Sequence, residues 1–290
     1  MSLINTVTNK ITGRERQVGR AVARRDIFIW AAAVLFLNYL FGVVKEIPST
    51  SVEGLVSELG AVGIFQYLAW YAVFRLLGSS GPGSAARSRD LLITAALCLP
   101  VFLPTSKTIW VAATGIAIYL WLFNAGDLKL RAAGIVLAAL AMQDLWGHIL
   151  FNLITMPLLR AETAVVGTLM EAIRPGTAWH DNAVTGPSGF SIVIINSCSS
   201  FHNLSLALLC WVTISRLSHQ NWRGRDFAFG AAIGVTMILF NVTRICLMSW
   251  DHDLYHYWHD GIGAEMFAIG ASLTVLVLSL YAARPAGRPA

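Results

Sequence analysis

The 290-residue sequence has few charged residues, because only 13% are Asp, Glu, Lys or Arg while 56% are hydrophobic. A soluble globular domain carries about 25% charged residues. The sequence also has no low-complexity segment and no internal repeat. Together with a mean hydropathy of +0.62, this shortage of charge excludes an ordinary soluble domain and indicates that a lipid bilayer surrounds most of the chain.

Cysteine is scarce as well. The four cysteines are Cys98, Cys198, Cys210 and Cys246, and no two of them form a CxxC pair. This spacing signals neither a zinc knuckle nor a dithiol redox motif. Three of them lie inside apolar runs, where a thiol behaves as a small hydrophobic group. Only Cys198 lies at the edge of an apolar run.

The N-terminus lacks the features of a cleavable signal peptide, since its basic stretch is long and no small-residue cleavage site follows the next apolar run. We expect residues 1–26 to form a basic cytoplasmic tail that contacts anionic lipid. The net charge of +5 does not indicate nucleic-acid binding, because the basic residues are spread between apolar runs. Such a spread is typical of membrane orientation.

The apolar runs predict an all-α polytopic membrane protein, since about 20 apolar residues cross a bilayer as a helix. We expect about eight transmembrane helices in one membrane domain, residues 27–283, and a cytoplasmic tail at 284–290. The predicted spans are 27–44, 61–78, 91–104, 109–126, 132–153, 198–215, 227–249 and 263–282. The third is short and contains Pro100 and Pro104, so spans three and four are alternatively a re-entrant pair.

The distribution of Lys and Arg predicts the orientation. Most of the 21 basic residues fall in one alternating set of connections, and the basic-rich side faces the cytoplasm. Both termini are therefore expected inside. The outer connection at 154–197 is long, and we expect it to hold a short interfacial helix at 161–173 and a β-hairpin around Gly186 and Pro187. Such a loop is either functional or a lid packed over the bundle.

Polar residues gather in three regions on the predicted outer side. The first is Asn196, Ser197, Cys198, Ser199 and Ser200, at the start of span six. A helix N-terminus favours the thiolate and offers N–H groups as an oxyanion hole, so Cys198 is a candidate nucleophile. The alternative is a small residue packed at a helix start.

The second region lies near the outer end of span seven. Asn241 and Arg244 are three residues apart and share a helix face. Arg244 either snorkels to the interface or faces the bundle and holds a substrate carbonyl or a developing oxyanion.

The third region, 251–260, contains three histidines and three aspartates. The spacing of His252, His256 and His259 suits a helical metal site, but no HExxH motif is present. The region alternatively supplies one general base, or is a wet interfacial loop. His202 is a second candidate base, because it lies four residues after Cys198 on the same helix face.

Two further functions compete with a thiol mechanism. The intramembrane residues Asn124, Asp144, His148 and Asn152 suggest a transporter, with Asp144 and His148 as a proton-linked pair. The absence of internal symmetry speaks against transport. A membrane metallohydrolase built on His252, His256 and His259 is the other alternative.

Taken in order, the three regions resemble the exosortase/archaeosortase family of transmembrane cysteine transpeptidases. The matching residues are Cys198-Ser199-Ser200, Asn241-x-x-Arg244-Ile245 and His259-Asp260-x-x-Gly263-x-x-x-Phe267, within residues 190–270. The family usually reads Cys-Ser-Gly, so Ser200 stands where a glycine is expected.

The resemblance implies a role for each residue. Cys198 would be the nucleophile, Arg244 the transition-state stabiliser and His259, rather than His202, the acid and base. The supporting residues would be Asn196, Ser199, Ser200, His202 and Asn241. No cofactor or metal is implied. The implied substrates are exported proteins that end in a short motif, a transmembrane helix and a basic tail, cleaved at the outer face of the cytoplasmic (inner) membrane, with an amine or water as acceptor.

Overall fold

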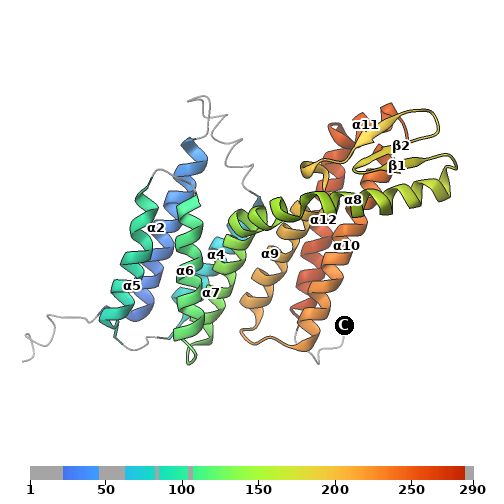
Figure 1. The fold of residues 1–290 in the computed structure, drawn as a ribbon. Coiled ribbons are helices and arrows are strands. Elements are labelled where there is room, and N and C mark those ends of the chain that lie inside the picture. Colours follow the sequence, from blue (N-terminus) through green and yellow to red (C-terminus); the bar gives the residue numbers. More distant parts are fainter. Residues whose placement is uncertain (1–21, 46–62, 82–84, 104–106, 285–290) are drawn as a thin grey trace, which may run out of the picture.

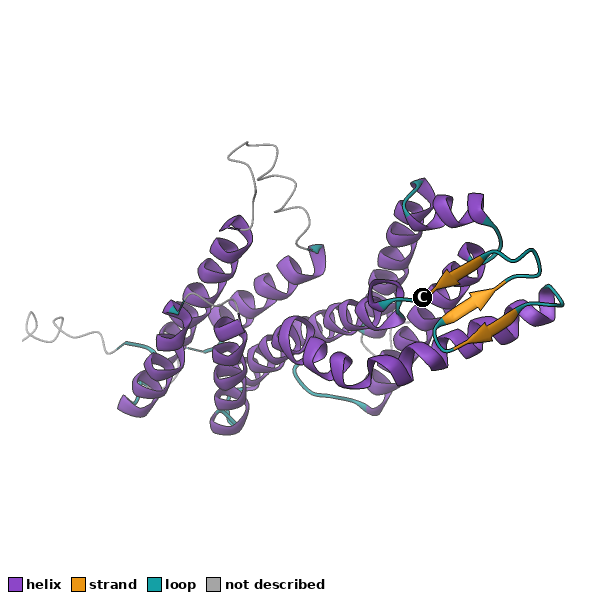
Figure 2. Ribbon diagram, turned by 45° about the horizontal axis from the view of Figure 1, so that its top comes forward, coloured by secondary structure: helices purple, strands orange, loops and turns teal. Residues whose placement is uncertain are grey.

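The computed structural model describes residues 22–45, 63–81, 85–103 and 107–284. Most of these residues are helical, with one small sheet (Figures 1 and 2). The long helices are α2 (Arg24–Lys45), α4 (Ile64–Ser79), α5 (Ser88–Cys98), α6 (Lys107–Phe123), α7 (Leu128–Ala141), α8 (Gly147–Ile173), α9 (Ser200–Ser218), α10 (Gly224–Met248) and α12 (Ile262–Ala282). The predicted tails lie mostly outside the described residues, and α2 begins inside the predicted N-terminal one.

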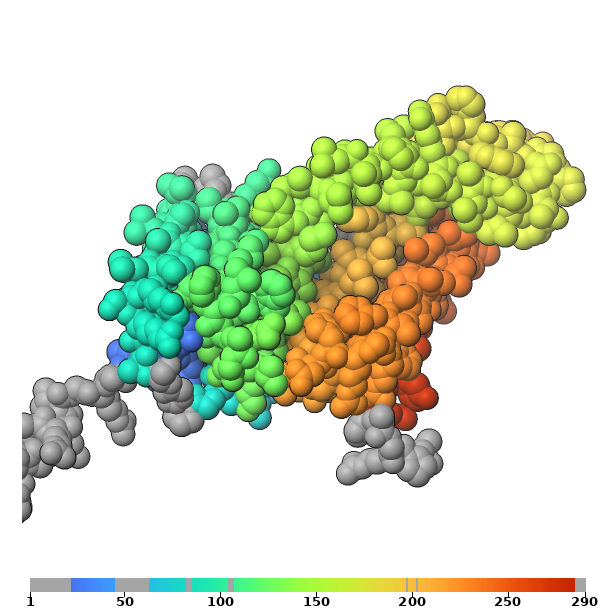
Figure 3. Space-filling view, turned by 60° about the horizontal axis from the view of Figure 1, so that its bottom comes forward, coloured from blue at the N-terminus to red at the C-terminus, as the bar shows by residue number. Residues whose placement is uncertain are grey.

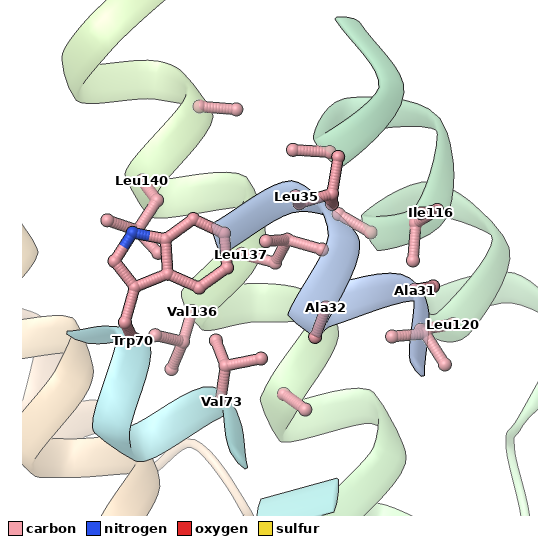
Figure 4. Packing of buried hydrophobic residues seen from close by; sticks show 14 of the residues in the cluster. Ala31, Ala32, Leu35, Trp70, Val73, Ile116, Leu120, Val136, Leu137 and Leu140 are labelled. Atoms are coloured by element: carbon pink, nitrogen blue, oxygen red, sulfur yellow. The ribbon is translucent and has the colours of Figure 1, made fainter. Parts of the chain in front are cut away.

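The first half of the chain forms a helical bundle. Helices α2, α4, α6 and α7 surround an apolar core in which Trp70, Leu35 and Leu137 are fully buried (Figure 4). Helices α6 and α7 approach closely at Gly134, where an added Cβ would lie 2.9 Å from Cβ of Leu120. Close approach at a small residue is how helices gain packing energy when lipid surrounds them.

Helix α9 joins this bundle to the second half of the chain. It packs against α4 and α7 on one side and against α10 and α12 on the other. Its buried side chains include Ala207 and Cys210, which meet Ile233 and Met237 of α10. Helix α9, which follows Cys198, therefore lies between the two halves of the molecule.

Helix α8 differs from its prediction. A single π-helical turn, η2 (Met142–Trp146), links α7 to α8, and α8 then continues to Ile173 and passes across the top of α9 (Figure 1). Residues 161–173 are helical as predicted, but they form the end of α8 and not a separate short helix. Pro157 costs one helical hydrogen bond, but burial of Leu159, Val166 and Met170 against α10 and the sheet holds the helix together.

The sheet lies beside the far end of α8 (Figure 2). Its antiparallel strands are β1 (Ala178–His180), β2 (Ala183–Thr185) and β3 (Ser191–Val193), in that order. The predicted hairpin is confirmed as β2 and β3, whose turn closes with Gly186 N–H donating to Phe190 O. Gly167 of α8 makes room for the ring of Trp179, because a Cβ there would lie 2.4 Å from the ring.

Each predicted span coincides with a helix, and four helical segments are long and apolar enough to cross a membrane: α2, the continuous α7–α8 unit, α10 and α12. Helices α6 and α9 are shorter, and the third span is α5 followed by the 3₁₀ turn η1 (Leu99–Phe102), which contains Pro100. The apolar helices indicate a membrane protein, while eight crossings remain a prediction.

Candidate active site

Cys198 lies in a strap, residues 195–200, that connects β3 to α9. It ends the 3₁₀ turn η3 (Asn196–Cys198), and the extended Ser199 then caps α9. The Cys198 N–H donates to Ile195 O over 2.9 Å, and Asn241 of α10 donates its side-chain amide to Cys198 O over 2.8 Å. These bonds hold the half-buried thiol directly before the first turn of α9.

A buried carboxylate from α8 holds the other end of the strap. Oε1 of Glu162 accepts hydrogen bonds from Ser200 N–H, over 2.8 Å, and from the Ser200 hydroxyl. Both residues are buried, with exposed fractions of 6% and 5%. A glycine at position 200 would make only the backbone N–H bond to Glu162. Ser200, which stands where a glycine is expected, therefore adds a side-chain contact. Sequence reasoning missed Glu162, whose only signal was an acidic residue in an apolar-periodic stretch.

The backbone N–H groups of the strap are already engaged. Cys198 N–H donates to Ile195 O, Ser199 N–H to Asn196 O, and Ser200 N–H to Glu162. In this structure these three amides therefore do not form the expected oxyanion hole.

Cys198 and His259 line the same small cavity, together with Ile245 and Tyr255. His259 ends helix α11 (His252–His259), and its ring stacks on Tyr255 with centroids 4.8 Å apart. The cavity volume is about 30 Å³, which is room for about one or two water molecules. The fold thus brings together two residues that are 61 positions apart in the sequence. Nδ1 of His259 lies 3.3 Å from a carboxylate oxygen of Asp260.

Arg244 points toward the end of α11. Its Nε donates to Trp258 O over 2.9 Å, and its Nη2 donates to His259 O over 3.3 Å. The guanidinium therefore faces the protein. This is the second of the two orientations that the sequence allowed for Arg244. A guanidinium has five N–H donors, and these two bonds leave donors that can meet a substrate carbonyl.

The remaining motif residues hold α11 in place. At Gly263 a Cβ would lie 2.5 Å from the ring of Tyr257, so only glycine fits without a shift. Phe267 packs against Trp258, with centroids 6.3 Å apart, and against Phe240, at 5.3 Å. The motif spacing therefore has a physical basis in how α12 supports the histidine-bearing helix.

His252 and His256 do not line the cavity that Cys198 and His259 share. Nε2 of His252 and Nε2 of His256 are 3.3 Å apart, and Nδ1 of His256 lies 3.5 Å from Asp260. Within the described part of the chain, no group of three or more His, Cys, Asp or Glu side chains could hold a metal ion. His202 lies in the first turn of α9, and its side chain, like that of Ser197, is outside what the structure describes.

The residues that suggested transport do not line one common cavity. The Asp144 carboxylate accepts from Nε2 of Gln66 at 3.0 and 3.2 Å, while His148 and Asn152 line a separate cavity. Asn124 is buried beside a third cavity that also contains Asp127. The expected pairing of Asp144 with His148 is absent from the described contacts.

The comparisons with known proteins agree with the family resemblance of the sequence. The family described as Transmembrane exosortase (Exosortase_EpsH) matches residues 59–276. No curated protein and no solved structure matches the chain. The matched segment covers more than half of the chain and contains the strap, Glu162, Arg244 and His259. The chain therefore belongs to the transmembrane exosortase family.

Proposed function

We propose that this protein is a membrane-embedded cysteine peptidase and transpeptidase that removes the C-terminal sorting signals of exported proteins. The observation that carries the proposal is the cavity shared by Cys198 and His259, with the Arg244 guanidinium bonded to the backbone of the same histidine. The thiol and the imidazole beside one cavity supply a nucleophile and a base. The Arg244 cation, bonded to the backbone of the same histidine, supplies an electrostatic stabiliser.

The first half-reaction forms an acyl-enzyme. His259 takes the thiol proton, and Asp260, whose carboxylate lies 3.3 Å from Nδ1, orients the imidazole. Sγ of Cys198 attacks the scissile carbonyl carbon, and a C–S bond forms. Arg244 stabilises the negative charge on the carbonyl oxygen. The C–N bond then breaks, His259 protonates the departing amine, and a thioester remains.

The second half-reaction releases the product. An amine or a water molecule attacks the thioester carbon, His259 accepts its proton, and the C–S bond breaks to restore the thiol. An amine acceptor gives a new amide, whereas water gives a free carboxylate. Asn241 and Glu162 hold the strap during both steps through their bonds to Cys198 O and Ser200.

The proposed substrates are exported proteins that end in a short motif, a transmembrane helix and a basic tail. The substrate helix would diffuse in the cytoplasmic membrane and reach the bundle laterally. Both termini of the enzyme would lie in the cytoplasm, and its site, within residues 190–270, at the outer face. This placement rests on the distribution of basic residues, and on the strap and α11 lying at the opposite end of the molecule from the 219–223 connection (Figure 1).

The test compares the C-termini of tailed surface proteins in host cells that carry wild type, Cys198→Ala or Cys246→Ala. Cys246 is a matched control, because it is also half-buried but does not line the cavity. We expect hydrophobic tails to persist only with Cys198→Ala, in mass spectra of membrane and envelope fractions. Equal processing by a stably inserted Cys198→Ala enzyme would refute the proposal.

A further inference from the structure

A second and larger cavity adjoins the strap. Its volume is about 330 Å³, which falls at the lower end of the range for ligand pockets. The described residues that line it are Gln143, His148, Phe151, Asn152, Asn196, Ser199, Phe201 and Ser205. We call it the polar cavity. In Figure 3 the surface is hollowed between the green α7–α8 segment and the orange α10, with α9 at the floor.

The strap lines both the polar cavity and the small cavity of Cys198 and His259, but it contributes different residues to each. Asn196 and Ser199 line the polar cavity, while Cys198 lines the small cavity with His259. Residues three apart in a 3₁₀ turn point the same way, and a residue between them points elsewhere. The strap therefore separates the two cavities, and a chain bound at Cys198 reaches the polar cavity within a few residues.

The described lining of the polar cavity contains no Asp, Glu, Lys or Arg and is rich in hydrogen-bonding groups. It has three carboxamides, two hydroxyls, one imidazole and the stacked rings of Phe151 and Phe201. Within the described residues His148, Asn152 and Asn196 make no side-chain hydrogen bond, and all three are exposed. Polar groups at membrane depth face water or a substrate path, because lipid cannot satisfy them.

A local irregularity of the helix also indicates a functional site. The π-helical turn η2 immediately precedes the residues of α8 that line the cavity. Single π turns inside α-helices occur frequently at functional sites. Gly147, which follows this turn, has no room for a side chain, because a Cβ there would lie 2.6 Å from the carbonyl oxygen of Met142.

A tailed substrate requires such a cavity. A peptide bond must be extended for attack, whereas the membrane anchor of the substrate must be helical. Between these two parts the backbone leaves the helix, and its N–H and C=O groups have no partners in lipid. A carboxamide offers the same donor and acceptor as a peptide group, so Gln143, Asn152 and Asn196 can satisfy that backbone.

We infer that the polar cavity binds the unwound segment of the sorting signal, between the scissile bond and the transmembrane helix of the substrate. This inference rests on the proposed function. Since the described residues that line the cavity include no Asp, Glu, Lys or Arg to pair with a charge, the bound segment has uncharged residues. The ligand class is thus an uncharged, extended peptide backbone.

Photo-crosslinking in host membranes tests this inference without knowledge of the recognised motif. A photoreactive phenylalanine analogue is placed at position 152 of the full-length Cys198→Ala enzyme, which keeps substrates uncut. The control places the same analogue at position 155, since Thr155 lies on the same helix but does not line the cavity. Adducts are mapped by mass spectrometry.

We expect the adducts of position 152 to map to the few residues between the cut site and the helix of a tailed protein, and those of position 155 to map to lipid. In the active enzyme, Asn152→Leu should raise the level of uncut precursor up to about tenfold, the value of one hydrogen bond, while Thr155→Val should not. Cys198 alkylation should stay unchanged in both.

Two results would overturn the inference. If the wild type removes tails but the photoreactive residue at position 152 crosslinks only to lipid or to the middle of the substrate helix, the inference fails and the proposed function stands. If the wild type removes no tails, the proposed function fails and the inference fails with it.

Discussion

Replacing Ser200 with alanine removes a hydroxyl that donates to Oε1 of Glu162 but keeps the backbone N–H that donates to the same oxygen. A hydrogen bond to a charged group contributes about 1.5–3 kcal/mol. We therefore expect the strap to open roughly 10 to 100 times more often in Ser200→Ala than in the wild type. Ser200→Gly should behave similarly, because it loses the same hydroxyl.

The assay is hydrogen exchange of amides 198–203, measured by mass spectrometry on the enzyme in lipid nanodiscs. Ser199→Ala is the matched control, because the Ser199 hydroxyl donates only to a neutral carbonyl, Asn196 O, over 3.0 Å. The loss of such a bond costs about 0.5–1.5 kcal/mol, so the control should exchange less rapidly than Ser200→Ala.

A double-mutant cycle isolates the contact. In a Glu162→Ala background, Ser200→Ala should add little, because the acceptor has already gone. Glu162→Gln should have a smaller effect than Glu162→Ala, since its amide oxygen still accepts both bonds. Equal effects of Ser199→Ala and Ser200→Ala, or an undiminished effect of Ser200→Ala without Glu162, would refute the assigned role of the carboxylate.

Three further outcomes follow from the geometry. Arg244→Lys keeps the charge but not the planar fork of donors, so cleavage should fall about 10²-fold while membrane insertion stays normal. The measurement is the amount of uncut precursor. Unchanged cleavage would remove the guanidinium from the mechanism. Gly263→Ala places a Cβ 2.5 Å from the ring of Tyr257, so α11 must shift and cleavage should fall while the melting temperature changes little. Asp90→Ala removes a fully buried carboxylate from its pair with Arg24, whose side chain is 11% exposed. This loss should cost about 3–5 kcal/mol, seen as a lower melting temperature. Asp26→Ala, at a side chain that is 43% exposed, should cost less than about 1 kcal/mol; equal shifts would contradict this difference.

Hydropathy predicted the positions of the helices, and motif order predicted the candidate site residues. The helices fall where the apolar runs lie, because a bilayer requires such runs. The motif order led to Cys198, Arg244 and His259, which the fold gathers around α11 and the strap. The spacing of Gly263 after His259 also has a physical cause, since the glycine accommodates Tyr257.

The missed features depend on tertiary contacts or on irregular helix geometry. Glu162 and Ser200 are 38 residues apart, and nothing in either local sequence indicates the other. Asp144 and His148 were expected on one face, but the π turn at 142–146 changes the helical phase between them. The continuation of α8 was missed because Pro157 and Arg160 lower the local hydropathy, whereas burial against the sheet sets where the helix ends.

The most direct test of the central claim is detection of the thioester at Cys198. Hydroxylamine cleaves thioesters, so treatment of host membranes should release tailed proteins that end in a hydroxamate at the cut site and leave a free Cys198 thiol. We expect hydroxamate-ended proteins with the wild type and with Cys246→Ala, and none with Cys198→Ala. Tails removed equally by Cys198→Ala, with no hydroxamate in any sample, would contradict a cysteine acyl-enzyme.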